Sequence, residues 1–134
     1  MQKPIVLHIV KAHAKSIELM VGNQEFTPDF GGIVHSFSGT LGQARAYIDL
    51  GLKISVGTGV LRKGFENLKR TVVSIDLKDL VLETDAPDQA VDRSALNRPA
   101  TLIDVGRAVA ALRNEPLDEI LQQNTRNLLQ IFKI

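Results

Sequence analysis

The sequence predicts an α/β fold: a TIM-barrel-type (β/α) architecture in which about four βα units form a partial barrel. Short apolar runs recur roughly every 20 to 30 residues, with helical patterns between them, which is the spacing of parallel strands covered by helices. A doubly wound layer of four strands fits the same rhythm. The barrel is favoured because His8, His35 and Asp85 each end a different apolar run, and barrel enzymes collect catalytic groups at strand ends.

Length and composition describe an ordinary globular protein. The 134 residues fit a single domain over 1–134, with 44% hydrophobic and 23% charged residues. A formal charge of +1 excludes a strongly basic module that coats nucleic acid. The absence of cysteine excludes disulfides and zinc bound by cysteine. The N-terminal apolar stretch is too short for a signal peptide and no apolar run is long enough to span a bilayer, so we expect a cytoplasmic protein with no membrane partner.

The first half of the chain predicts two βα units. Gly22 and Gly51 stand where the two helices should stop, and Thr40 can cap the second helix. The expected elements are a strand over 4–8, a helix over 11–22, a loop over 23–31, a strand over 32–36 and a helix over 40–50.

The second half continues the alternation and then becomes helical. Pro99 suits the first turn of a helix, and Asn124 is expected to cap the last one. The third helix is expected to turn four apolar side chains inward, namely Phe65, Leu68, Val72 and Val73. The expected elements are a strand over 52–57, a loop over 58–64, a helix over 65–73, a strand over 80–84, a loop over 88–97, a helix over 99–113, a short helix from Pro116 and the final helix.

Two carboxylates end the fourth apolar run. Glu83 and Asp85 are two positions apart, so in a strand they share a face. Like charges this close raise each other's pKa unless a positive group lies between them, and a divalent metal is the usual one. The alternative is that both are the solvated end of a strand, with Asp85 starting a turn before Pro87.

His8, His35 and Asp85 together predict a metal site. Two histidines and a carboxylate hold zinc or manganese while leaving positions open for water. The metal would lower the pKa of that water, and Asp85 would serve as the catalytic residue by accepting its proton. Glu83 would act as a partner behind a ligand, or as a loop contact. His13 is expected to be a solvated surface histidine.

Evidence for an anionic substrate is weaker. The hydroxyls of residues 36–40, including Ser38, form either a phosphate cradle or an ordinary helix cap. Arg62 and Lys63 lie in a glycine-containing loop that lacks the Lys and Ser/Thr of a phosphate-binding motif. Arg98 either reaches over the site or forms a loop salt bridge. Ser38, Arg62, Lys63 and Arg98 are the candidate substrate-binding residues.

Five segments form a recognisable set: PIVLH at 4–8, GIVHSFSG at 32–39, LETDAP at 82–87, NRP at 97–99 and NTRNLLQIF at 124–132. Together they resemble the TatD-type metal-dependent deoxyribonucleases, within the amidohydrolase-like barrel enzymes. The resemblance implies a seven- or eight-stranded barrel hydrolase that cleaves DNA phosphodiester bonds with a divalent metal (zinc, manganese or magnesium). By this resemblance His8 and His35 match family metal ligands, and Asp85 matches the catalytic aspartate that also binds metal.

The chain also departs from the family pattern. The family's N-terminal His-x-His pair and a glutamate ligand are absent, and Ile9 and Val10 replace a small polar residue and an arginine. We therefore expect the C-terminal half of such an enzyme, with impaired activity alone. Its open edges would expose the inner faces of Val6, Val34, Val56 and Val81 and favour association, as in a homodimer of half barrels. The alternatives are an amidohydrolase-like enzyme acting on a neutral ester or amide, and an inactive half barrel used as an interaction module.

Overall fold

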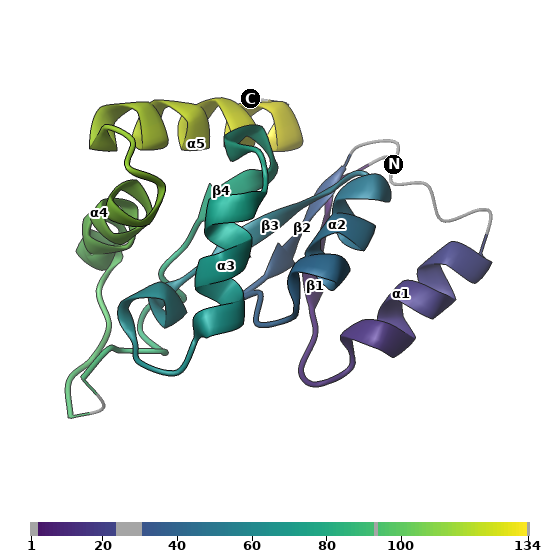
Figure 1. Ribbon diagram of the computed structural model, residues 1–134, viewed down its shortest axis with the longest axis horizontal. Helices are drawn as coiled ribbons and strands as arrows, with labels where there is room; N and C mark the ends of the chain where they lie inside the picture. The colour runs from purple at the N-terminus through teal and green to yellow at the C-terminus, as the bar shows by residue number, and fades with distance from the viewer. Residues whose placement is uncertain (1–2, 24–30, 93, 134) are drawn as a thin grey trace.

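The computed structural model describes residues 3–23, 31–92 and 94–133, so most of the loop expected over 23–31 lies outside the described residues. Its elements alternate as predicted in the first two thirds of the chain and are helical thereafter (Figure 1). In order they are β1 (Ile5–His8), α1 (His13–Gly22), β2 (Gly32–His35), α2 (Leu41–Asp49), β3 (Leu52–Val56), the 3-10 helix η1 (Thr58–Leu61), α3 (Glu66–Ser74), η2 (Leu77–Asp79), β4 (Leu80–Leu82), η3 (Pro99–Thr101), α4 (Leu102–Arg113) and α5 (Leu117–Phe132).

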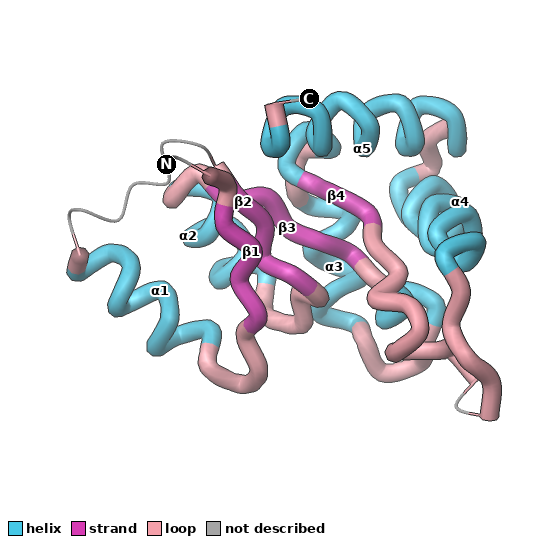
Figure 2. Tube along the Cα trace, turned by 180° about the vertical axis from the view of Figure 1, so that it is seen from behind, coloured by secondary structure: helices cyan, strands magenta, loops and turns pink. Residues whose placement is uncertain are grey.

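The four strands form one parallel sheet in the order β1-β2-β3-β4. The predicted α/β class with four parallel strands is therefore confirmed. Helices α2 and α3 lie in front of the strands in Figure 1 and behind them in Figure 2. A doubly wound sheet reverses its strand order and carries helices on both faces. A sheet in chain order with α2 and α3 on the same face is instead a segment of a (β/α) barrel.

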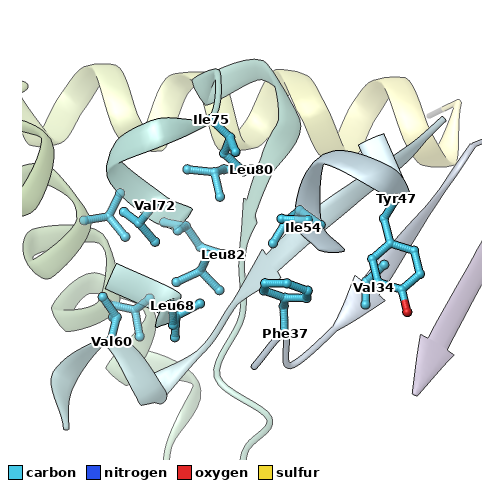
Figure 3. Close-up of a cluster of buried hydrophobic side chains, with 14 of the residues drawn as sticks. Val34, Phe37, Tyr47, Ile54, Val60, Leu68, Val72, Ile75, Leu80 and Leu82 are labelled. Atoms are coloured by element: carbon cyan, nitrogen blue, oxygen red, sulfur yellow. The ribbon is translucent and has the colours of Figure 1, made fainter. Parts of the chain in front are cut away.

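The hydrophobic core lies between the sheet and these helices (Figure 3). Val34, Ile54 and Leu82 supply side chains from three strands, and Leu68 and Val72 meet them from α3. Burial of an aliphatic side chain of this size contributes about 1.5–3 kcal/mol, so this layer holds the strand ends in register. Val73, which was expected to point inward, is instead 53% exposed, because it follows Val72 by one helical position and so points to another side of α3.

The four valines that were expected to be exposed on the open side of the sheet are not all exposed. Val34 and Val56 are fully buried, because side chains alternate across a strand and Val34 points away from the face that carries His35. Val81 is also buried. Of the four valines expected to be exposed, Val6 alone is, with 57% of its surface accessible. The exposure expected for Val34, Val56 and Val81 is therefore wrong.

Helix α5 is continuous from Leu117 to Phe132, so the expected cap at Asn124 is wrong. Asn124 lies in the middle of the helix, and its Oδ1 accepts the Leu82 backbone N–H at 2.8 Å. Asn127 Nδ2 donates to the Leu80 carbonyl at 2.5 Å and to the Leu77 carbonyl at 2.9 Å. These two amides satisfy the main chain on the edge of β4 that faces away from β3, as a neighbouring strand would.

Two smaller differences concern loops. The segment expected to be a loop over 58–64 begins with η1, and β4 ends at Leu82 rather than at residue 84.

The cap of α2 is confirmed: Thr40 Oγ1 accepts from Gln43 N while Gln43 Oε1 accepts from Thr40 N, a reciprocal capping box. Among the described residues, no helix combines the length and apolarity needed to cross a bilayer.

Candidate metal centre

The strand-end histidines lie side by side. His8 and His35 are register partners at the C-terminal ends of β1 and β2, and their ring centroids are 5.5 Å apart. Both line a cavity of about 300 Å³ whose wall also includes Ser38 and Gln89. The sequence prediction that the ends of separate strands bring these two side chains together is thus reproduced by the sheet register.

Glu83 holds His35 from behind. Its Oε2 accepts from His35 Nδ1 at 2.8 Å and from the buried Ser55 hydroxyl, and its Oε1 accepts the Ser36 backbone N–H at 2.7 Å. The bond at Nδ1 orients the His35 ring and leaves Nε2 directed elsewhere. A carboxylate bound to one ring nitrogen of a histidine is the usual support for a histidine that binds metal through the other.

Asp85 faces that second nitrogen. Its Oδ1 lies 3.4 Å from His35 Nε2, and its Oδ2 accepts from Gln89 Nε2 at 2.6 Å. The Asp85 backbone, in the loop beyond β4, is left-handed, with φ of 58°. This conformation is tolerated by aspartate more readily than by most residues.

These residues fit part of a metal site. His35 Nε2 and Asp85 Oδ1 are a nitrogen and an oxygen donor close enough to share an ion, and Glu83 prepares the histidine. Across residues 3–23, 31–92 and 94–133, however, no group of three or more His, Cys, Asp or Glu side chains is arranged to hold a metal. His8 lies next to His35 but does not complete a group of three. The described residues therefore bring together two candidate ligands, His35 and Asp85, with His8 as a third candidate beside them.

The candidate substrate-binding residues take different positions. Ser38 is exposed and lines the cavity, while Lys63 and Arg98 are exposed on loops. Arg62 is turned inward: its Nη2 donates to the carbonyls of Gln89 at 2.6 Å and Ala90 at 2.8 Å. In this arrangement Arg62 holds the loop that follows β4.

Sequence reasoning missed Gln89 and Asn97. Gln89 contacts Asp85, and the buried Asn97 donates through Nδ2 to the carbonyls of Thr84 and Asp88, closing the same loop. Asn97 lies inside the NRP segment, in which the charge of Arg98 is the stronger signal of a binding residue. For Gln89 the only local signal was its position four residues after Asp85.

His13 is a further correction. It is only 7% exposed, and its Nδ1 lies 3.2 Å from the Tyr47 hydroxyl, which donates to the His13 carbonyl at 3.3 Å. Its ring also packs near Phe37, with the centroids 5.1 Å apart. Burial lowers the pKa of His13, since the charged imidazolium loses solvent. The expected surface histidine therefore joins α1 to α2.

Comparison with known proteins identifies the family of this chain. The family model described as TatD related DNase matches residues 1–133. The chain belongs to this family. Its curated relatives include an uncharacterized metal-dependent hydrolase of Haemophilus influenzae, which is 38% identical over 103 residues, or 75% of this chain and 39% of the relative. The uncharacterized metal-dependent hydrolase YjjV of Escherichia coli K12 is 33% identical over 98% of this chain and 50% of its own length. A protein of Edwardsiella piscicida named 3'-5' ssDNA/RNA exonuclease TatD is 31% identical over 98% of this chain and 53% of its own length.

Solved structures agree. The crystal structure of the TatD homologue YjjV from Escherichia coli superimposes with a TM-score of 0.89 at 32% identity, over 98% of this chain and 50% of that one. A TatD family hydrolase of Entamoeba histolytica, at 19% identity, shows the same fold with a TM-score of 0.81. The chain spans about half the length of the TatD-related relatives it matches.

Proposed function

We propose that this chain contributes to metal-dependent hydrolysis of phosphodiester bonds in DNA. The observation that supports this most strongly is the linked set Glu83, His35 and Asp85, in which Glu83 fixes one ring nitrogen and Asp85 faces the other. Family membership and the printed names of the relatives support a divalent metal and a hydrolytic reaction. The name of the Edwardsiella relative supports a nucleic-acid substrate.

In this proposal His35 Nε2 and Asp85 Oδ1 would hold the ion, with His8 as the adjacent ligand. When bound, a divalent ion polarises a phosphoryl oxygen and makes water a better nucleophile. Glu83 keeps the His35 ring oriented and its Nδ1 protonated, because a carboxylate accepts and cannot donate. The Asp85 carboxylate, whose Oδ2 is held by Gln89 at 2.6 Å, would also accept the proton of the attacking water.

A neutral ester or amide is the second candidate substrate. The cavity beside His8 and His35 is lined partly by apolar side chains, including Ile9, Val10 and Phe65, which favours an uncharged group. A phosphodiester would instead need a cation, and Lys63 and Arg98 are the exposed candidates. Replacing both by alanine separates these readings: hydrolysis of single-stranded DNA should fall sharply, whereas hydrolysis of a neutral ester should not change.

We also propose that the chain associates through its open side, as a homodimer or with another polypeptide. The open side is the β1 end of the sheet, opposite the edge of β4 that α5 covers. Three apolar side chains are largely exposed there: Val6 on β1, and Leu19 and Val21 on α1 (Figure 1). Sedimentation measures the oligomeric state, and binding of an apolar dye measures the exposed apolar surface. A monodisperse monomer with little dye binding would exclude association.

The deciding experiment for the function is calorimetric titration with zinc, manganese and magnesium. The native chain is compared with His35→Ala and Asp85→Ala, and with Asp104→Ala on the exposed side of α4 as control. We expect binding that is lost in both site variants and kept in the control. Absence of binding by the native chain would favour the third reading, an inactive half barrel that serves as an interaction module.

A further inference from the structure

Gln89 links the two carboxylates of the candidate metal centre. It contacts Asp85 directly, and it reaches Glu83 through Ser36, whose backbone N–H bonds Glu83 Oε1 and whose hydroxyl lies 2.8 Å from Gln89 Nε2. Carboxylate oxygens only accept hydrogen bonds, so the group facing Asp85 at 2.6 Å must be the amide nitrogen of Gln89. The orientation of the amide is thereby fixed by its surroundings.

The backbone of Gln89 is anchored independently of its side chain. Its carbonyl accepts from the buried Thr58 hydroxyl at 2.6 Å and from Arg62 Nη2 at 2.6 Å. Its φ of 55° is left-handed, which a non-glycine residue adopts only when the surroundings hold it there. Thr58 and Arg62 belong to the segment that follows β3, whereas Gln89 and Asp85 belong to the segment that follows β4. The segment after β3 therefore anchors the residue that contacts Asp85.

The Asp85 carboxylate is held between Gln89 and His35. About a third of its side chain is exposed, and its carboxylate has two described polar neighbours, Gln89 at Oδ2 and His35 at Oδ1. Bonding Oδ2 to Gln89 leaves Oδ1 directed at His35 Nε2. Glu83 thus contacts one ring nitrogen of His35, and Gln89 contacts the Asp85 oxygen that does not face His35.

We propose that Gln89 is a positioning residue that holds the Asp85 carboxylate for metal binding. This rests on the proposed metal-dependent function. Partners behind metal ligands typically change metal affinity by about 10- to 100-fold when they are removed. A role in substrate contact is the competing explanation, because Gln89 also lines the cavity beside His8 and His35.

The test uses the full chain with Gln89→Met, which keeps the side-chain length and removes the amide, and Gln89→Asn, which keeps the amide and shortens its reach. Gln122→Met, on the exposed face of α5, is the matched control. Crystal structures without metal report the distance from Asp85 Oδ1 to His35 Nε2, and calorimetry with Zn²⁺ reports affinity. We expect Asp85 to rotate away in both variants, the His35–Glu83 bond to persist, and Zn²⁺ to bind about tenfold more weakly.

An Asp85 side chain that keeps its position in both variants overturns the proposal, as does Zn²⁺ affinity equal to that of the native chain. Unchanged Zn²⁺ affinity with weaker substrate binding would assign Gln89 to the substrate instead. If the native chain binds no Zn²⁺, the proposed function of the isolated chain fails, and the crystal structures alone decide whether Gln89 positions Asp85.

Discussion

The side-chain oxygen of Asn124, in the middle of α5, accepts the backbone N–H of Leu82 on β4 at 2.8 Å. Because Asn124 is buried, water cannot pair with the Leu82 N–H, and the Asn124 side chain supplies the partner instead. A helix thus covers an edge that a strand would otherwise pair with, at the residue immediately before Glu83.

Asn124→Ala should destabilise the fold by about 1–3 kcal/mol, because it leaves the Leu82 N–H buried without a partner. Urea unfolding followed by circular dichroism measures the change. Gln122→Ala, exposed on the same helix, should shift the free energy of unfolding by less than about 0.5 kcal/mol. Equal losses in the two variants would show that the bond to β4 contributes nothing specific.

Glu83→Gln should weaken metal binding by about 10- to 100-fold without removing any candidate ligand. An amide can accept at one atom only, whereas Glu83 accepts from His35 and Ser55 at Oε2 and from Ser36 at Oε1. Calorimetry with Zn²⁺ measures the affinity, and Glu119→Gln, exposed in the first turn of α5, is the control. Native affinity in Glu83→Gln would mean that the orientation of His35 does not depend on a carboxylate.

Arg113→Lys should cost about 1–3 kcal/mol of stability although it keeps the charge. The Arg113 guanidinium donates to the carbonyls of Val72 at 2.7 Å and Ile75 at 2.8 Å, at the end of α3, while also bonding Glu115. A lysine ammonium cannot reproduce this planar set of contacts. Thermal and urea unfolding measure the loss.

The control for that change is Arg107→Lys. Its guanidinium forms an exposed pair with Asp104 on the surface of α4, and pairs of this kind contribute about 0–1 kcal/mol. Similar small effects at positions 107 and 113 would show that the bonds from Arg113 to the Val72 and Ile75 carbonyls do not stabilise the fold.

The native chain should lose stability on acidification more steeply than His13→Phe. Burial lowers the pKa of His13 in the folded state, so the unfolded chain takes up the proton first as the pH falls. The contribution of His13 is therefore fully present above its ordinary pKa of about 6.5 and is lost as the pH falls below it. Phenylalanine cannot titrate, and it leaves the Tyr47 bond to the backbone carbonyl of residue 13 in place.

Urea midpoints between about pH 7.5 and 5.5 check this prediction. The difference between the native chain and His13→Phe cancels the contributions of His8 and His35, which both proteins share. Parallel pH dependence in the two proteins would show that His13 does not titrate differently in the folded and unfolded states.

Local patterns were sufficient for the elements and for the residues that end the strands. Side-chain alternation, helix stops and the βα rhythm depend on neighbours in sequence, so the sheet and the convergence of His35 and Asp85 could be predicted from them. The resemblance to TatD-type enzymes placed the same residues in a metal site, and the family match confirmed the family.

The remaining features depend on contacts between residues far apart in the chain. Asn124 has the local signature of a helix cap, but it lies in the middle of α5. There its side chain pairs with the backbone N–H of Leu82, 42 residues away on β4. Gln89 meets Ser36 across 53 residues, and His13 is buried by Tyr47 across 34. A polar side chain in isolation carries no mark of its partner, since burial and pairing arise only when packed elements bring complementary groups together.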